Sequence, residues 1–349
     1  MNLYQTQHPF YCGIDLHANK MYACVVDSTG KKQLHSNFHT QDTQTFVQSI
    51  TPFNKKPGDL VIGCESTFNW YWLCDLCEGK DIPFVLGHAL YLKAIHGAKV
   101  KNDKVDSEKL AYLLRGGNFA VAYAYPKPWR ATRNLLRRRT HYVRRRGQTL
   151  AHITNLHHQY NLPLGKPLQY ASNRIGVAER FSDPAVAFSV TSDLEMLSHY
   201  DDNIRSLERF LEQSAKVDDA NNFFRLQTIP GVGRIIAMTM LYEIHDIKRF
   251  PEVGDFLSYC RLVKGEHSSN GKSYGSPGKK IGNAFLKWAF SEAVPLLKRC
   301  SPEAKAWAQR MEKKHSTARA NSILAAKLGR AVYMMLRRGE VFDIKRMIN

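Results

Sequence analysis

Four carboxylates in the first third of the chain have the types and the order of a metal-binding site. Asp15 follows an apolar run, and Glu65 closes the apolar run that begins at residue 60. Asp103 and Asp106 open a segment with helical periodicity, and residues three apart on a helix share a face. Two hard divalent cations about 3.5–4 Å apart need mostly carboxylate oxygens, and they stabilise both sides of a phosphoryl transfer. The pattern therefore predicts two-metal chemistry on a phosphate.

Each acid alone also has a simpler explanation. An Asp after a strand is commonly a turn or helix-capping residue, and acids at a helix start favour the macrodipole. The order strand–Asp, strand–Glu, helix–Asp-x-x-Asp is much rarer, and it is typical of the metal site of RNase H/RuvC-like nucleases. We therefore assign four residues as both metal ligands and catalytic residues: Asp15, Glu65, Asp103 and Asp106.

The elements that must position these acids alternate between strand and helix patterns. Apolar runs predict strands at 10–15, 21–27, 60–65, 82–87 and 119–125. Helical patterns cover 41–50, 67–79 and 103–115. Alternation of this kind predicts an α/β domain with a mixed sheet over residues 1–126.

An arginine-rich segment follows, and its periodicity predicts one long helix that ends at the break at 161–167. A second helix is expected over about 191–215, with an apolar seam at steps of three and four formed by Leu197, Tyr200, Ile204, Leu207 and Leu211. The two helices predict either an antiparallel hairpin or an oligomerising coiled coil over 127–216. We expect nucleic acid to contact eight arginines of the first helix: Arg130, Arg133, Arg137, Arg138, Arg139, Arg144, Arg145 and Arg146.

The remaining segment, 217–349, reads as mostly helical. The turn Ile-Pro-Gly-Val-Gly, which contains Gly231 and Gly233, resembles a helix-hairpin-helix element, whose backbone N–H groups bind a DNA phosphate. A plain glycine turn is the alternative. The Gly/Ser-rich stretch 265–278 predicts a loop, and helices are expected from about 283, over 302–313 and over 317–338.

Charge points to a polyanionic partner. The net charge is +19, and it is unevenly distributed along the chain. Residues 109–178 contain thirteen Lys and Arg and no acid, and residues 261–349 carry nineteen basic and six acidic residues. The remainder is net negative, so nucleic-acid backbone contact is expected at the two basic blocks.

The seven cysteines are scattered, no apolar run reaches about 18 residues, and no signal peptide is visible. We expect a cytoplasmic bacterial protein associated with the nucleoid and not with a membrane, with Cys74 and Cys77 as core thiols.

Taken together, these motifs resemble those of a known family. The acidic quartet, the arginine-rich middle and the block from IPGVG through RLVKGEHSSNGKSYGSPGKKIGN to LKWA resemble the DEDD transposases of the insertion-sequence-110 family, to which pilin-gene invertases are related. The resemblance implies an RNase H/RuvC-like α/β domain, a helical coiled-coil middle and a mostly helical transposase domain with a helix-hairpin-helix-like element.

The family implies DNA strand exchange with Mg²⁺ at the four acids and a serine nucleophile that forms a covalent phosphoserine link to DNA. It also implies a structured bridge RNA that pairs with donor and target DNA, and assembly of protomers into dimers or tetramers. Carried over by motif, the nucleophile is Ser269, with Ser268, Ser273 and Ser276 as weaker candidates. We expect three lysines to hold the phosphate there: Lys272, Lys279 and Lys280.

Two other functions compete with the RNA-guided recombinase. A RuvC-like nuclease would cut DNA with metal-activated water and leave no covalent adduct. A non-catalytic nucleic-acid-binding protein would keep an inactive RNase H fold, and the intact quartet argues against it. Within the family, genomic context distinguishes a transposase from a site-specific invertase.

Overall fold

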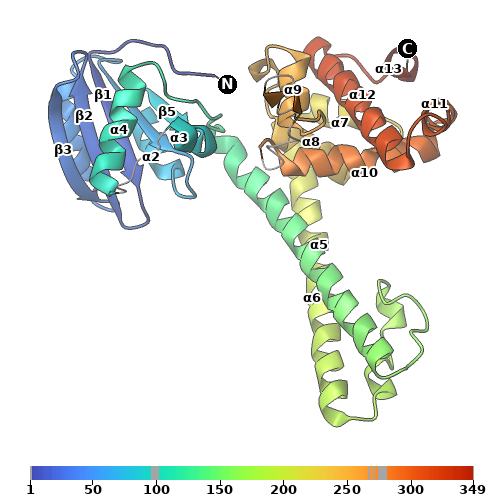
Figure 1. Cartoon of the computed structure of the whole chain (residues 1–349). Coiled ribbons are helices and arrows are strands. Elements are labelled where there is room, and N and C mark those ends of the chain that lie inside the picture. The colour runs from blue at the N-terminus through green and yellow to red at the C-terminus, as the bar shows by residue number, and fades with distance from the viewer. Residues whose placement is uncertain (1, 96–101, 266–267, 270–271, 274–280, 349) are drawn as a thin grey trace. The chain divides into compact units, whose positions relative to one another are not determined.

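The computed structural model describes residues 2–95, 102–265, 268–269, 272–273 and 281–348. The chain forms two compact units, Met1–Lys127 and Pro128–Asn349 (Figure 1). The division of the second unit into an arm and a C-terminal domain stays a prediction.

The first unit is built on a five-stranded mixed sheet with the order β3-β2-β1-β4-β5. Its strands are β1 (Phe10–Leu16), β2 (Lys20–Asp27), β3 (Lys32–His39), β4 (Leu60–Glu65) and β5 (Phe84–Gly87). The first three strands pair antiparallel, while β4 runs parallel to β1 and β5 parallel to β4. The mixed α/β sheet expected from the sequence is confirmed.

Helices cover both faces of this sheet. One face buries Cys12, Ile14 and Ile62 among residues of α1 (Thr43–Ile50) and α2 (Tyr71–Glu78). The opposite face packs against α4 (Asp103–Arg115), which Figure 1 shows lying across the strands. A short helix, α3 (Ala89–Ile95), follows β5. Because strand residues alternate between faces, every second residue of β1 and β4 points toward α4.

One strand prediction was wrong, and one strand was missed. Residues 119–125 form no strand; they make isolated bridges, from Ala120 to Leu3 and from Val121 to Gly87. Strand β3 was not predicted, because its sequence KQLHSNFH is polar and mostly accessible. Such an edge strand has one paired neighbour, so its sequence lacks the apolar run of a central strand.

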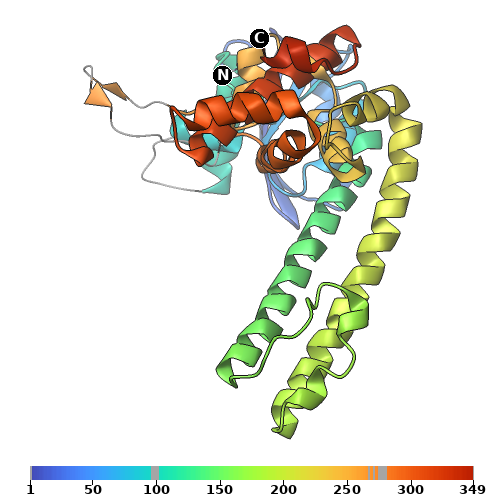
Figure 2. The same cartoon turned by 90° about the vertical axis from the view of Figure 1, so that its right-hand side faces the viewer.

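The second unit begins with two long helices, α5 (Lys127–Gln159) and α6 (Pro184–Asp218), which run side by side in Figure 2. Between them lie two short 3₁₀ helices, η2 (Ala171–Asn173) and η3 (Ala178–Arg180). An apolar cluster joins these segments: Ile153, Leu168, Val177, Phe181, Val190 and Leu197. The seam that contains Leu197 is therefore used within the chain, as an antiparallel hairpin. Helix α6 starts earlier than predicted, because Asp183 accepts hydrogen bonds from the first turn.

The rest of the unit is helical around one large core. Its helices are α7 (Ala220–Gln227), α8 (Arg234–Ile244), η4 (Ile247–Arg249), α9 (Val253–Tyr259), α10 (Ala284–Cys300), α11 (Pro302–Glu312), α12 (Thr317–Arg338) and α13 (Ile344–Ile348). A two-stranded hairpin, β6 (Ser268–Ser269) with β7 (Lys272–Ser273), lies in the predicted loop. Within the described part of the chain, no helix has the length and apolar character needed to cross a membrane.

Candidate active site

The ends of β1 and β4 bring two of the predicted acids to neighbouring strands. The strands are parallel, and Ile14 pairs with Cys64 in their register. Asp15 and Glu65 are the next residue of each strand, so the register places them beside each other. Both belong to the alternate set that contains Gly13 and Gly63, which faces α4.

Helix α4 supplies the other two acids from its first turn. Asn102 caps the helix by accepting a hydrogen bond of 3.0 Å from the backbone N–H of Lys104. Asp103 and Asp106 follow in the first turn, three residues apart and on one face. The helix N-terminus favours negative charge there. A capped start thus fixes both carboxylates near the end of the sheet.

Glycine in the strands allows the close approach of α4. A Cβ at Gly13 would lie 2.2 Å from the backbone nitrogen of Ala111 and 2.3 Å from the carbonyl oxygen of Ser107, so no side chain fits there. A Cβ at Gly63 would lie 2.7 Å from Leu114 Cδ1. The helix therefore rests against the strand backbone just before Asp15.

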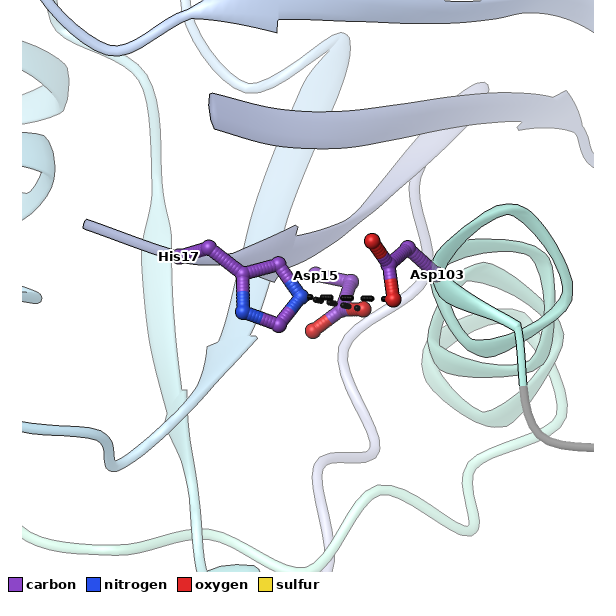
Figure 3. Close-up of side chains that lie close together, drawn as sticks. All are labelled: Asp15, His17 and Asp103. Carbon is purple, nitrogen blue, oxygen red and sulfur yellow. Dashed lines mark ion pairs between the residues drawn. The ribbon is translucent and has the colours of Figure 1, made fainter. Parts of the chain in front are cut away.

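Three side chains converge at this point. His17 Nε2 lies 3.3 Å from Asp15 Oδ2 and 3.4 Å from Asp103 Oδ1, as Figure 3 shows. The ligand atoms of the three residues all lie within 4.8 Å of one another. The side chain of Asp15 is 24% exposed, whereas those of His17 and Asp103 are more than half exposed. The cluster is therefore open to a phosphate-bearing ligand.

The electrostatics of the cluster favour a cation. Burial raises the pKa of Asp15, the charge of His17 acts to lower it, and the charges of Asp103 and Asp106 raise it further. Crowded carboxylates destabilise one another when all are ionised, and a divalent cation would relieve that repulsion. Asp106 is also paired with Lys109 at 3.4 Å. The oxygen donors present thus fit the metal that the sequence predicts.

Two of the four predicted acids lie in the compact ligand group of the described residues, and two lie outside it. Among the described residues, the compact group of potential ligands contains Asp15 and Asp103 with His17, while Glu65 and Asp106 lie outside it. Glu65 is half-buried at the end of β4. Sequence reasoning missed His17, although a signal exists. His17 directly follows the strand that ends at Leu16, and it stands two positions after Asp15, the spacing at which strand residues share a face.

The predicted nucleophile lies in the hairpin of the second unit. Ser269 pairs with Lys272 in the register of β6 and β7, and Lys272 is exposed. Lys279 and Lys280 lie outside the described residues, as does Ser276. The serine and the carboxylates therefore belong to different compact units.

The arginines of α5 divide into two groups. Arg133 and Arg137 bind the buried carboxylate of Glu243, at 2.9 and 2.6 Å. Arg139 pairs with Glu208 of α6, Arg146 pairs with Asp201, and Arg130 is buried.

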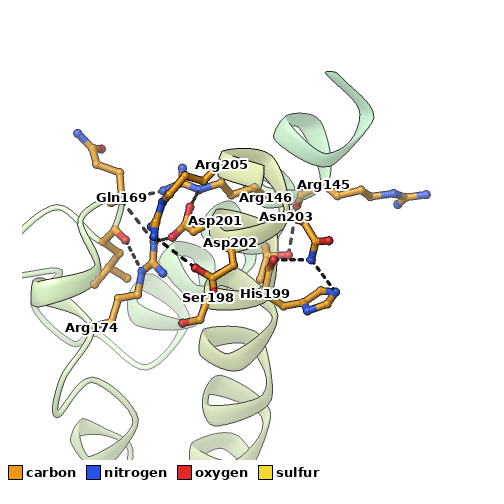
Figure 4. A network of polar contacts seen from close by, with 12 residues as sticks. Arg145, Arg146, Gln169, Arg174, Ser198, His199, Asp201, Asp202, Asn203 and Arg205 are labelled. Atoms are coloured by element: carbon orange, nitrogen blue, oxygen red, sulfur yellow. Dashed lines mark hydrogen bonds and ion pairs between the residues drawn. The ribbon is translucent and has the colours of Figure 1, made fainter. Parts of the chain in front are cut away.

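In contrast, Arg138, Arg144 and Arg145 are exposed. Figure 4 shows Arg145 pointing away from the contacts that hold Asp201, which Arg146 and Arg174 bind together. The exposed arginines are available to a polyanion, whereas the paired arginines already bind acids of the same chain and join its helices.

The glycine turn of the predicted helix-hairpin-helix connects α7 to α8. Gly231 has a φ of +83°, and a Cβ there would lie 2.7 Å from the backbone carbon of Leu296 on α10. Packing and the positive φ together account for glycine at this position. Gly233 is the N-cap of α8, and no atom lies within 4 Å of its missing Cβ. The start of α8 thus has room beside it at Gly233.

Comparison with known proteins agrees with these features. Residues 12–161 match a family model described as a transposase of DEDD type from IS110 elements, and residues 224–309 match one described as the transposase IS116/IS110/IS902 family. The chain belongs to the IS110 family of transposases. The first match spans all four acids, and the second spans Gly231 and Ser269.

A curated relative covers nearly the whole length. The chain is 23% identical over 344 residues to the transposase for insertion sequence element IS1111A of Coxiella burnetii. The aligned region covers 95% of this chain and 90% of the relative. Membership in a transposase family implies DNA binding, DNA cleavage and strand transfer, and the DEDD type implies use of a divalent metal.

Proposed function

We propose that this transposase cuts and rejoins DNA through a covalent phosphoserine link formed by Ser269, with Mg²⁺ held at the DEDD acids and a structured bridge RNA as guide. The observation that carries the metal-dependent part is the convergence of Asp15 and Asp103, from a strand and a capped helix, on one point. The second family match, which includes Ser269, supports the serine as the partner nucleophile.

The proposed reaction is a phosphoryl transfer. The Ser269 Oγ attacks the scissile phosphorus, the serine proton leaves, a phosphoserine ester forms, and the departing DNA oxygen takes up a proton. A serine hydroxyl is a weak nucleophile at its own pKa and needs activation. Bound divalent ions supply this by lowering that pKa and by stabilising charge on the phosphate oxygens. A DNA hydroxyl oxygen then attacks the phosphorus of the phosphoserine and loses its proton. The bond from phosphorus to Ser269 Oγ breaks, the serine oxygen takes up a proton, and the strands are rejoined.

Nucleic-acid contacts are proposed on three surfaces of the second unit. The exposed Arg138, Arg144 and Arg145 present positive charge along α5. The N-terminus of α8 at Gly233 presents backbone N–H groups, and Lys272 is exposed beside Ser269 in the hairpin register. Contacts of this kind to the phosphate backbone of a nucleic acid form with any sequence. Selection of the target sequence is therefore assigned to base pairing with the RNA.

The test is the covalent intermediate. End-labelled donor and target DNA, the element's RNA and the full chain are incubated with Mg²⁺ and separated by denaturing electrophoresis. We expect a protein–DNA adduct that maps to Ser269, that requires Mg²⁺ and RNA, and that is lost in Ser269→Ala and in Asp15→Ala. Ser268→Ala and Ser273→Ala are matched controls that retain it.

Each outcome separates one part of the proposal. Cut DNA with free ends and no adduct contradicts the serine mechanism and favours a RuvC-like nuclease. An adduct that maps to Ser268 corrects the residue. Full strand exchange by Asp15→Ala contradicts the metal assignment, and adduct formation without RNA contradicts the guide.

A further inference from the structure

We infer that His17 is a further metal ligand of the carboxylate centre, so that the centre, besides Mg²⁺, takes first-row transition cations through one nitrogen and at least two oxygens. The inference rests on the proposed metal site and changes its expected chemistry. An all-carboxylate site binds hard ions such as Mg²⁺, whereas an imidazole nitrogen favours Co²⁺, Ni²⁺ or Zn²⁺.

The first support is the face on which His17 lies. Asp15 and His17 are two residues apart at the end of β1, and Leu16 between them is buried in the core on the opposite face. His17 Nε2 accordingly points at Asp15 Oδ2 and Asp103 Oδ1 (Figure 3). One nitrogen therefore faces oxygens supplied by both the sheet and α4.

The second support is that the backbone of His17 is fixed. Its N–H donates a hydrogen bond of 2.9 Å to the carbonyl oxygen of Lys20, which closes the turn into β2. Its carbonyl oxygen accepts one of 2.8 Å from Asn69 Nδ2, and Asn69 Oδ1 accepts one of 2.9 Å from Thr67. The loop that follows Glu65 thus holds the backbone of His17 in place, as a preorganised ligand requires.

The third support is the spacing of the donor atoms. Two ligand atoms that each lie about 2.1 Å from one ion are about 3.0 Å apart at a right angle and about 3.4 Å apart at the tetrahedral angle. The observed separations of 3.3 and 3.4 Å from His17 Nε2 fall in this range. At these separations a single cation can contact the nitrogen together with either carboxylate, and the ligand oxygens of Asp15 and Asp103 lie within 4.8 Å of each other.

An ion pair between a protonated His17 and the two acids is the competing explanation. It makes the opposite prediction for metal binding. If His17 is a ligand, removing its ring weakens binding, most strongly for cations that favour nitrogen. If His17 only neutralises the acids, its side chain competes with the cation, and removing it leaves metal affinity unchanged or increases it.

The experiment is a metal titration of the full chain without nucleic acid. Binding of Co²⁺ alone and of Mg²⁺ alone is measured by calorimetry, and the visible absorption of bound Co²⁺ reports its ligands. We expect His17→Ala and His17→Gln to weaken Co²⁺ binding about tenfold or more and to shift the Co²⁺ spectrum. Mg²⁺ binding should change by less than about threefold, because water replaces the nitrogen at little cost.

Two further variants make the result decisive. His39→Ala, an exposed histidine at the end of β3, should leave both affinities unchanged. Asp15→Asn should abolish binding of both ions. Equal Co²⁺ affinity and spectrum in His17→Gln, with binding lost in Asp15→Asn, overturns the role of His17 alone. Unchanged binding in Asp15→Asn overturns the metal centre itself.

Discussion

Asn283 Nδ2 donates a hydrogen bond of 2.7 Å to Glu243 Oε2, which is buried between helices of the second unit. Asn283 also caps α10, because its Oδ1 accepts hydrogen bonds from the first turn of that helix. Arg133 and Arg137 bind the same carboxylate from α5. One acid of α8 therefore joins α5 to the start of α10, directly after the segment that carries the proposed nucleophile.

Removing this carboxylate should be strongly destabilising. Glu243→Ala leaves Arg133 and Arg137 without the acid that neutralises them, and breaking a buried pair costs about 3–5 kcal/mol. We expect a loss of that size in the free energy of unfolding, measured by urea denaturation. Glu212→Ala is the matched control, since Glu212 pairs with exposed Arg234 and Lys216 and should cost about 1 kcal/mol or less. Equal losses would contradict the role of Glu243.

The same contacts predict a dependence of stability on pH. Burial acts to raise the pKa of Glu243, but the hydrogen bond from Arg137, the charges of Arg133 and Arg137, and Asn283 lower it overall. A pKa that is lower in the folded state adds stability above the unfolded value of about 4.5, and this stability is lost as pH falls through the folded pKa. Glu243→Gln should flatten the pH dependence below about 4.5 in denaturation experiments. A variant with the slope of the parent protein would refute this linkage.

Sequence reasoning could assign the four acids to their strands and helix because strand and helix periodicity is local. Apolar alternation places Asp15 at a strand end, and the i, i+3 spacing places Asp103 and Asp106 on one face without knowledge of the fold. The same periodicity could not show which arginines of α5 are paired. Arg137 meets Glu243 across 106 residues of chain, and such a contact depends on how the helices pack.

The close contact between the sheet and α4 also escaped prediction, and it can be tested at Gly13. Gly13→Ala puts a Cβ against the backbone of α4, so the helix must move and carry Asp103 away from Asp15. We expect a loss of about 2–3 kcal/mol in unfolding free energy and weaker Co²⁺ binding. Gly79→Ala, where the nearest atom to the new Cβ is 3.4 Å away, is the control. Normal metal affinity in Gly13→Ala would show that α4 adjusts without disturbing the acids.

The two groups of arginines on α5 make the last prediction. Changing Arg138, Arg144 and Arg145 together to Gln should weaken binding to RNA and DNA of any sequence. The magnitude of the log–log salt slope should fall by about 0.7–0.9 for each phosphate that the variant no longer neutralises. Unfolding free energy should change little, because these side chains are exposed. Arg139→Gln should instead lower the unfolding free energy and leave the salt slope little changed, because it breaks the pair with Glu208 that joins α5 to α6.

A control variant on another helix, compared per arginine removed, separates position from total charge. Arg337 and Arg338, exposed at the end of α12, are changed to Gln in a second variant. If the α5 surface is the binding site, each arginine removed from α5 lowers the slope more than each removed from α12. Equal effects per charge would mean that net charge alone drives binding. An unchanged slope in the α5 variant would mean that its exposed arginines contact only solvent, and the proposed role of the arm would fail.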